Sequence, residues 1–267
     1  HDPRSVSVIV CAHDEEQNLK ELIPLLLSQQ HPAFEVIIVN DRSNDGTYDF
    51  LLAETKKDER LRMVNTTSVP EHINGKKYGI TLGIKAAKNE WIVLTDADCR
   101  PNSDGWLQAI SSKCSTDKEI VLGCSPYQYE KGFLNLFIRF ETLFTAIQYF
   151  GYAILGNPYM GVGRNLAYRK SLFLNNKGFN GFLRVTGGDD DLFINQHASA
   201  KNTSICFGGE SLIYSLPKKT YASYFQQKVR HLAVGKKYKA SHRFLLGIFV
   251  LSHCITWFAG LPLLFFF

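Results

Sequence analysis

The sequence predicts an α/β fold in which a mostly parallel sheet is flanked by helices on both faces. Short apolar runs rich in β-branched residues alternate with segments of helical apolar spacing over the first hundred residues, which is typical of strand–helix–strand units. These runs are apolar throughout, as expected for strands that are covered on both faces. An apolar content of 45% over 267 residues is sufficient for a large core and excludes a disordered chain.

Strands and helices alternate regularly through residues 1–100. The expected strands are residues 6–12 (VSVIVCA), 35–40 (EVIIVN), 61–65 and 91–95 (WIVLT), and the expected helices are residues 15–29, a segment ending at residue 55, and residues 75–88. Pro24 interrupts the apolar pattern of the first helix and is expected to disturb it. Asn44 or Asp45 is suited to cap the second helix.

The second half of the chain is less regular. Residues 119–123 have the composition of a strand, and residues 133–155 (FLNLFIRFETLFTAIQYFGYAIL) predict a long aromatic-rich helix. This helix fits equally well in a core or at a membrane interface. Residues 221–238 predict a further helix that carries several basic side chains.

The net charge of +5 is unevenly distributed. Residues 1–210 hold 22 Lys or Arg against 25 Asp or Glu, whereas residues 211–267 hold eight Lys or Arg and no acid. An acidic body followed by a basic tail argues against a nucleic-acid partner. The charge of the body and the charge of the tail each require an explanation of their own.

The basic tail leads into residues 244–267, which contain 24 residues without a charge. A helix of this length spans about 36 Å, and a bilayer core needs about 20 such residues. We therefore expect a transmembrane or membrane-embedded helix rather than a buried core helix, with the preceding basic residues on the cytoplasmic side. Because the chain begins at His1 and stops inside the run, this helix is expected to be truncated.

Polar residues follow the predicted strands at the sheet edge where ligands bind in such folds. Asp96 and Asp98 come directly after the strand 91–95. In an extended chain the side chains of residues i and i+2 point the same way. Two such carboxylates are suitable ligands for Mg²⁺ or Mn²⁺, whose shell substrate phosphates would complete. The alternative is an acidic triplet on the surface.

Two further acidic positions are candidates for chemistry. Asp41 ends the strand 35–40, where it can accept a hydrogen bond from an N–H group such as a uracil imide, although the following residues also fit a helix-capping turn. Asp189, Asp190 and Asp191 are adjacent, and their mutual repulsion raises the proton affinity of at least one of them. That suits a general base; the alternative is a solvated helix N-terminus.

The order of these motifs resembles the family-2 glycosyltransferases over roughly residues 5–231. Segment 11–16 (CAHDEE) is similar to the opening signature of the family, with Cys and His in place of Pro and Tyr. Segment 188–192 (GDDDL) is similar to the Glu-Asp-x-Asp-Leu segment that holds the catalytic base, although its Glu is missing. Segment 227–231 (QKVRH) matches the Gln-x-x-Arg-Trp motif of membrane-bound members except at the last residue.

The resemblance implies a role for each matching position. It assigns the base to Asp189, with Asp190 as the alternative, and the metal to Asp98 with support from Asp96. Donor binding is expected at Cys11, His13, Glu15, Asp41, Lys76, Asp96, Gln227 and Arg230, with Lys77 as a competitor of Lys76. Glycines 161 and 163 are expected to admit the acceptor, and Arg164 and Asn165 to orient the acceptor or the donor.

The resemblance also implies the fold and the reaction. The fold would be the A-type, Rossmann-like glycosyltransferase fold over residues 1–240, with a nucleotide-binding half over about residues 1–100 and an acceptor half over about 101–240. The reaction would be an inverting, metal-dependent transfer of sugar from a nucleotide-sugar donor, most often UDP-linked, to a lipid-linked or polysaccharide acceptor. The expected location is the cell inner membrane, with the catalytic domain in the cytoplasm.

Two alternatives belong to other classes of protein. A non-catalytic membrane scaffold of the same fold predicts loss of the metal pair or of the base, and both are present. A sugar-phosphate nucleotidyltransferase needs a glycine- and arginine-rich loop after the first strand, where this chain has CAHDEE.

Overall fold

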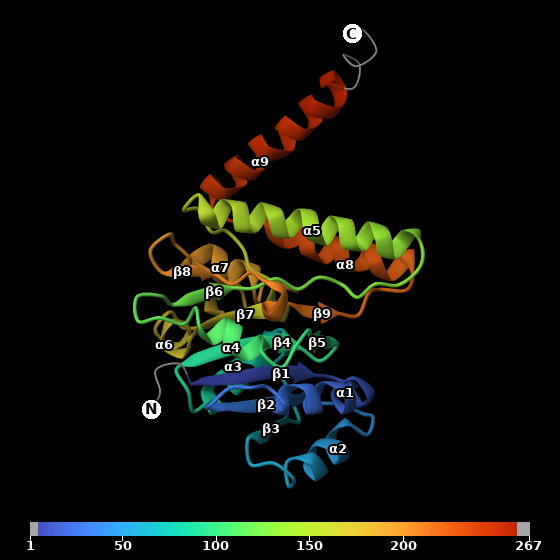
Figure 1. Ribbon diagram of the computed structural model, residues 1–267, viewed down its shortest axis with the longest axis vertical. Coiled ribbons are helices and arrows are strands. Elements are labelled where there is room, and N and C mark those ends of the chain that lie inside the picture. Colours follow the sequence, from blue (N-terminus) through green and yellow to red (C-terminus); the bar gives the residue numbers. More distant parts are fainter. Residues whose placement is uncertain (1–4, 261–267) are drawn as a thin grey trace.

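A seven-stranded sheet lies at the centre of residues 5–260, the part of the chain that the computed structural model describes (Figure 1). The strand order is β3-β2-β1-β4-β7-β6-β8, and β5 and β9 form a separate two-stranded sheet. The strands are β1 (Val6–Ala12), β2 (Phe34–Asp41), β3 (Leu61–Thr66), β4 (Trp91–Asp96), β5 (Cys99–Pro101), β6 (Ile120–Leu122), β7 (Leu166–Arg169), β8 (Thr203–Ile205) and β9 (Ile213–Ser215).

The helices surround this sheet and form a layer above it (Figure 1). They are α1 (Glu16–Leu27), α2 (Thr47–Glu54), α3 (Gly75–Ala86), α4 (Trp106–Ser111), α5 (Phe133–Ile154), α6 (Lys170–Asn175), α7 (Asp191–His197), α8 (Tyr221–Gly235) and α9 (Ala240–Ile255). Helix α1 continues through Pro24, whose side chain is exposed.

The predicted mostly parallel sheet is confirmed. β3, β2, β1 and β4 pair in parallel, whereas β7 runs antiparallel to both β4 and β6. The register places Cys11 opposite Asp96, and Ala12 opposite Asn40. The carboxyl ends of β1, β2 and β4 therefore meet at one edge, and the segments that follow them are brought together there.

Alternate residues of the central strands fill two separate cores, because successive side chains of a strand point to opposite faces. Val8 and Val10 of β1 pack with the buried faces of α1 and α4. Ile9 lies on the other face with residues of α3, α5 and α7. The continuous apolar runs of the sequence thus reflect a sheet covered on both sides.

Helix α3 approaches the sheet closely through two glycines. A Cβ atom at Gly83 would lie 2.6 Å from Ile9 Cγ2 and 3.1 Å from Val39 Cγ2, and one at Gly79 would lie 3.2 Å from Cys11 Sγ. The missing side chains let the helix backbone rest on β1 and β2. This close contact positions the N-terminal turn of α3 at the edge where the strands end.

Helices α5 and α8 lie side by side above the sheet (Figure 1). Lys228 of α8 forms an ion pair with Glu141 of α5, and the ring of Tyr224 meets that of Phe137 edge-on at 5.9 Å. Helix α9 extends from the end of this layer, where Tyr152 donates a hydrogen bond to the Leu245 carbonyl.

The transmembrane helix predicted over residues 244–267 is not found in the described part of the chain. Helix α9 has 16 residues, includes polar side chains such as Arg243 and His253, and gives way to a π-helical turn at Thr256–Gly260. Within residues 5–260, no helix is both long and apolar enough to cross a membrane. The remainder of the prediction, residues 261–267, lies outside the described residues.

Candidate active site

Lys76 joins two acidic segments that are far apart in the sequence. Its ammonium lies 2.9 Å from Asp96 Oδ1 at the end of β4 and 3.4 Å from Asp189 Oδ2 in the loop before α7. The Asp189 side chain is only 7% exposed, whereas that of Lys76 remains 43% exposed. The structure thus brings together three of the predicted site residues at the carboxyl edge of the sheet.

The charges of this cluster shift one another's proton affinities. Burial favours the neutral form of Lys76, but the carboxylates of Asp189 and Asp96 outweigh it and hold its pKa well above the ordinary value. Burial raises the pKa of Asp189, and Asp190 and Asp96 add to this rise against the opposing charge of Lys76. Burial would also raise the pKa of Asp96, but the close Lys76 ammonium lowers it. Asp189 is consequently a stronger proton acceptor than Asp96.

The prediction that Asp96 and Asp98 lie in one extended strand is wrong. Ala97 and Asp98 form a turn between β4 and β5. The turn is held by Arg100, whose guanidinium donates to the carbonyls of Ala97 at 3.0 Å and Cys99 at 2.8 Å. Burial and the nearby Asp96 charge raise the pKa of Asp98, so the two carboxylates are close enough to repel each other.

This pair fits a hard divalent cation, because two carboxylates that repel each other gain from a shared positive charge. Within residues 5–260, no group of three or more His, Cys, Asp or Glu side chains is arranged to hold a metal without help. Asp96 and Asp98 are the two residues that could contribute carboxylate ligands to a cation whose remaining ligands are phosphate oxygens.

Asp190 is engaged in a different way from Asp189. Its Oδ2 accepts a hydrogen bond from the backbone N–H of Gly163 at 2.7 Å, and its Oδ1 accepts one from the N–H of Asp191 at 2.8 Å. It is the N-cap of α7. Both oxygens are thus committed to backbone groups, which ties the 163–165 turn to α7.

Lys77 lies beside Lys76 but faces the protein interior. It is fully buried, and its ammonium donates to the carbonyls of Val185 and Gly187. The next residue, Gly188, has a φ of +78°, which suits glycine. Lys77 and Gly188 therefore shape the loop that carries Asp189, and of the two lysines only Lys76 contacts the carboxylates.

The segments after β1 and β2 meet around Asp41. Arg42 Nε donates to Asp41 Oδ1 at 2.8 Å, and a Cβ atom at Gly75 would lie 2.9 Å from Asp41 Oδ2. His13 Nδ1 lies 2.5 Å from the Asp41 carbonyl oxygen. The start of α3 thus leaves room for the Asp41 carboxylate, which the sequence analysis assigns to the nucleotide base.

Glu15 and Cys11 lie on the flanks of this region. Glu15 accepts a hydrogen bond from Asn18 Nδ2 at 2.5 Å, and burial together with the charges of Asp98 and Asp96 raises its pKa. Cys11 is partly buried against Gly79.

Helix α8 reaches the site through Gln227, whose Nε2 lies 3.3 Å from the Tyr127 hydroxyl. The Tyr127 ring in turn lies 4.5 Å from the guanidinium carbon of Arg164. Arg164 Nη1 is buried without a hydrogen-bond partner. The charges of Asp96 and Asp98 both raise the pKa of Arg164. Arg230 lies on the exposed surface of the same helix.

The expectation that Asn165 orients a ligand is wrong. Asn165 is fully buried and bonds Trp106 Nε1 and the carbonyls of Cys124 and Ser211, so it is a structural tie rather than a ligand contact. Gly163 packs closely against Asp190, because a Cβ atom at Gly163 would lie 3.2 Å from Asp190 Oδ2. The expectation that Gly161 and Gly163 admit the acceptor stays a prediction.

Lys218 is a further cation whose charge reaches the cluster and which no sequence motif marked. Its charge lowers the pKa values of Asp96, Asp98 and Glu15. In the sequence it lies between β9 and α8. In the sequence it is one of eight basic residues in the tail, and nothing distinguishes it from the others. Tyr127 was missed for the same reason, because no motif surrounds it.

Comparisons with known proteins identify the family of the chain and several relatives. The sequence model of the family described as "Glycosyl transferase family 2" matches residues 7–175. The 4,4'-diaponeurosporenoate glycosyltransferase of Staphylococcus haemolyticus is 26% identical over 97% of this chain and 69% of its own length. A poly-beta-1,6-N-acetyl-D-glucosamine synthase of Staphylococcus epidermidis is 30% identical over 35% of the chain and 21% of its own length.

Solved structures show the same fold. The mannosyltransferase PcManGT from Pyrobaculum calidifontis, solved with GDP-Man and Mn²⁺, superimposes with a TM-score of 0.66 at 19% identity, over 85% of this chain and 61% of that one. S. aureus TarS 1–349 in complex with UDP-GlcNAc gives a TM-score of 0.55 at 16% identity, over 90% and 69%. At these identities the likeness concerns the fold alone.

Proposed function

Because this chain belongs to glycosyl transferase family 2, we propose that it transfers a sugar, with inversion, from a nucleotide-sugar donor to an acceptor hydroxyl. The observation that carries the proposal is the contact of Lys76 with both Asp96 and Asp189. The contact supports the proposal because Asp96 belongs to the pair proposed to hold a metal and Asp189 is a buried carboxylate of raised pKa. A displacement with inversion at an anomeric carbon needs the base and the leaving group on opposite sides of that carbon.

Asp189 is the proposed base. It would take the proton of the acceptor hydroxyl as the hydroxyl oxygen bonds to the anomeric carbon and the bond from that carbon to the diphosphate breaks. The raised pKa of Asp189 makes it a better acceptor of this proton than an ordinary carboxylate. Asp190, with both oxygens committed to backbone N–H groups, would instead hold the acceptor-side turn in place.

The donor would lie across the carboxyl ends of β1, β2 and β4. Asp41 would accept from the base, most simply a uracil imide, with Cys11, His13 and Glu15 lining the same edge. Asp98, with Asp96, would hold Mg²⁺ or Mn²⁺, which when bound would stabilise the charge that develops on the leaving diphosphate. The Mn²⁺ in the mannosyltransferase complex supports a divalent cation.

Cations of the chain would act on the same leaving group. Lys76 and Arg164 lie beside the acidic pair, and the Arg164 Nη1 atom has no partner in the described chain. Lys218 adds a third charge near Asp98. Gln227 and Arg230 of α8 would approach the diphosphate from above, as the resemblance implies. Because the leaving group is already anionic, no general acid is required.

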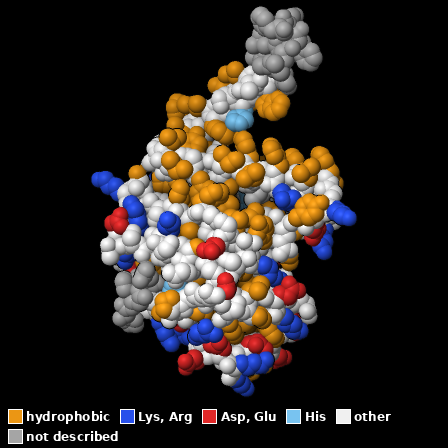
Figure 2. All heavy atoms as spheres, in the orientation of Figure 1, with side chains coloured by type: hydrophobic (Ala, Val, Ile, Leu, Met, Phe, Trp, Pro, Cys, Tyr) orange, Lys and Arg blue, Asp and Glu red, His pale blue; other side chains and the backbone are white. Residues whose placement is uncertain are grey.

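We also propose that the acceptor is lipid-linked or a growing polysaccharide at the cytoplasmic face of the inner membrane. The support is an apolar platform, which we define as the exposed side chains at helical spacing on α5 and α8: Phe133, Leu136, Phe137, Phe140, Leu143, Phe144, Ile147, Phe225, Val229 and Leu232. Figure 2 shows hydrophobic side chains gathered where these helices and α9 lie.

Basic residues adjoin the platform at Lys236, Lys237, Lys239 and Arg243, all exposed. An amphipathic surface with cations at its margin is the pattern of a domain that rests on anionic lipid. Two relatives support such acceptors by their names, a 4,4'-diaponeurosporenoate glycosyltransferase and a poly-beta-1,6-N-acetyl-D-glucosamine synthase.

The proposal is tested by incubating the full chain with UDP-, GDP- and ADP-linked sugars, membrane lipids and Mn²⁺, and measuring the released nucleoside diphosphate. We expect release with one nucleotide class and its loss on chelation of the metal. Absence of both release and nucleotide binding with every donor would contradict the proposal and favour a non-catalytic scaffold.

A further inference from the structure

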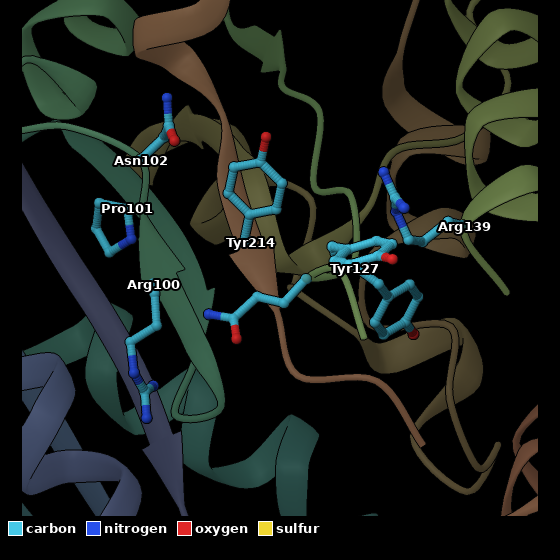
Figure 3. A pocket seen from close by; sticks show the side chains of 8 residues that line it. Arg100, Pro101, Asn102, Tyr127, Arg139 and Tyr214 are labelled. Carbon is cyan, nitrogen blue, oxygen red and sulfur yellow. The ribbon is translucent and has the colours of Figure 1, made fainter. Parts of the chain in front are cut away.

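A groove of about 440 Å³ opens beside Tyr127 (Figure 3). Its walls come from β5, β9, the segment 127–129 and the N-terminal half of α5. The volume lies within the roughly 300–1,000 Å³ of small-molecule sites. The lining includes Tyr127, Tyr129, Tyr214 and Arg139 and contains no Asp or Glu.

The groove is joined to the candidate active site by shared residues. Tyr127 lines the groove. Its ring meets Arg164, and its hydroxyl meets Gln227. Arg100 contributes to the floor, but its guanidinium points away from Tyr214 (Figure 3). It bonds the turn of Asp96–Asp98 and pairs with Glu21 at 2.9 Å. The groove is thus joined through Arg100 to the turn that carries the acidic pair.

The wall of the groove is fixed by buried polar contacts. Asn135 of α5 is 5% exposed and donates to the Gln128 carbonyl at 3.0 Å, while its Oδ1 accepts from the Glu130 N–H at 2.9 Å. The Gln128 N–H donates to the Ser215 carbonyl at 3.0 Å. The segment that carries Tyr127 and Tyr129 is therefore held in place before any ligand arrives, which reduces the entropic cost of binding.

Arg139 is the cation of the groove that is available to a ligand. Arg100 is committed to protein groups, whereas the Arg139 guanidinium lies over the Tyr129 ring at 5.2 Å and forms no ion pair within residues 5–260. Its side chain belongs to an exposed residue. An arginine held over an aromatic ring presents its N–H groups to carboxylate or phosphate oxygens.

We infer that this groove is a subsite for the acceptor and that it takes a sugar bearing an anionic group, either phosphate or carboxylate. The inference rests on the proposed function. The tyrosine rings would pack on the apolar faces of the sugar ring, and Arg139 would bind the anion. The acceptor hydroxyl would then approach the reacting carbon past Tyr127, from the side opposite the nucleotide-base site at Asp41.

The test measures binding of defined probes to the full chain by ligand-observed NMR, with the donor site filled by whichever of UDP, GDP and ADP the chain binds. The probes are glucose 1-phosphate, the neutral methyl glucoside, and dodecyl glucosyl phosphate as a lipid-linked form. The variants are Arg139→Gln and Tyr214→Leu. Lys131→Gln is the matched control, because Lys131 is an exposed cation just before α5 that does not line the groove.

We expect the wild-type chain to bind glucose 1-phosphate more tightly than methyl glucoside. Arg139→Gln should weaken glucose 1-phosphate about tenfold, the usual scale of a lost charge-assisted hydrogen bond, and leave methyl glucoside unchanged. Tyr214→Leu should weaken both probes, and Lys131→Gln neither. If dodecyl glucosyl phosphate binds more tightly than glucose 1-phosphate with the same dependence on Arg139, the natural acceptor is lipid-linked. If the two probes bind equally, the natural acceptor is a soluble sugar.

Equal affinity of the wild-type chain for the charged and neutral sugars, or an unchanged affinity in Arg139→Gln, would overturn the inference. Binding of UDP, GDP and ADP, measured on the wild-type chain in the same series, separates this outcome from failure of the proposed function. A chain that binds one of these nucleotides but shows no Arg139 dependence retains the function and loses the subsite. A chain that binds none of them loses the function itself.

Discussion

The three adjacent aspartates at the N-terminal end of α7 have three different environments. Asp189 faces Lys76, Asp190 accepts from two backbone N–H groups, and Asp191 accepts from the Tyr238 hydroxyl at 2.7 Å. Burial and the charge of Asp190 raise the pKa of Asp191 to about 7. The side chains are chemically identical, so their sequence could not assign one role to each. The positive φ of Gly188 and the carbonyl contacts of Lys77 set the direction of each carboxylate.

At the scale of single residues, the contacts of Glu35 predict how the free energy of unfolding depends on pH. Burial would raise its pKa, but the Lys88 N–H, Arg62 and Ser7 all donate to its carboxylate and together lower it. Because the folded-state pKa lies below the unfolded one, this stabilisation is present above about pH 4.3 and is lost as the pH falls through the folded value.

Replacement of Glu35 by Gln should therefore lower the free energy of unfolding by roughly 1–3 kcal/mol at pH 7 and flatten its decline in acid. Urea unfolding at pH 7 and at pH 3.5 measures both effects. Glu71→Gln, at an exposed position, is the control and should change neither. An acid limb as steep in Glu35→Gln as in the wild-type chain would contradict the account.

At the scale of elements, the sequence predicted the first four strands and the helices among them to within a few residues. It predicted these because each is a long apolar or periodic run. It did not predict β5, β7, β8 or β9, which have three or four residues each and too few positions for a pattern. The reversal of β7 follows from its pairing with β4, a long-range contact that local periodicity does not contain.

The close packing of α3 on the sheet gives a second prediction. Gly83→Ala would place a methyl group 2.6 Å from Ile9 Cγ2, and we expect it to lower the free energy of unfolding by roughly 1–3 kcal/mol despite the better helix propensity of alanine. Gly151 of α5 has nothing within 4 Å of its added Cβ. Gly151→Ala should therefore raise stability by up to about 1 kcal/mol. Thermal unfolding of both variants checks the signs, and a stabilised Gly83→Ala would show that the contact is not tight.

At the scale of the whole molecule, charge and apolar surface are separated. The acidic body holds the candidate catalytic groups, and the basic tail includes Lys218 beside the acidic pair and the cations next to the apolar platform. The sequence predicted a membrane contact mainly from the apolar run 244–267, with the helix 133–155 fitting a core or a membrane interface equally well. The structure instead distributes exposed apolar residues over α5, α8 and α9, an arrangement that appears only when the helices are placed side by side.

The platform predicts binding to anionic vesicles. The full chain should sediment with vesicles that contain phosphatidylglycerol more strongly than with phosphatidylcholine alone, and less so at high salt. The double variant Phe140→Glu, Ile147→Glu should weaken this binding at least tenfold, because it places two acids on the apolar face. The control is Leu25→Glu with Leu52→Glu, exposed apolar residues on α1 and α2. Equal loss in both double variants would count against a docking surface on α5 and α8.

The separate roles of Asp189 and Asp190 test the central claim most directly. The measurement is sugar transfer, with nucleotide binding in parallel, for Asp189→Asn and Asp190→Asn in the full chain. The account predicts that Asp189→Asn loses about 10²–10⁴-fold in transfer and still binds nucleotide, whereas Asp190→Asn, which keeps a good N-cap, stays within about tenfold of the wild-type rate. Transfer retained in Asp189→Asn, or lost equally in both variants, would contradict it.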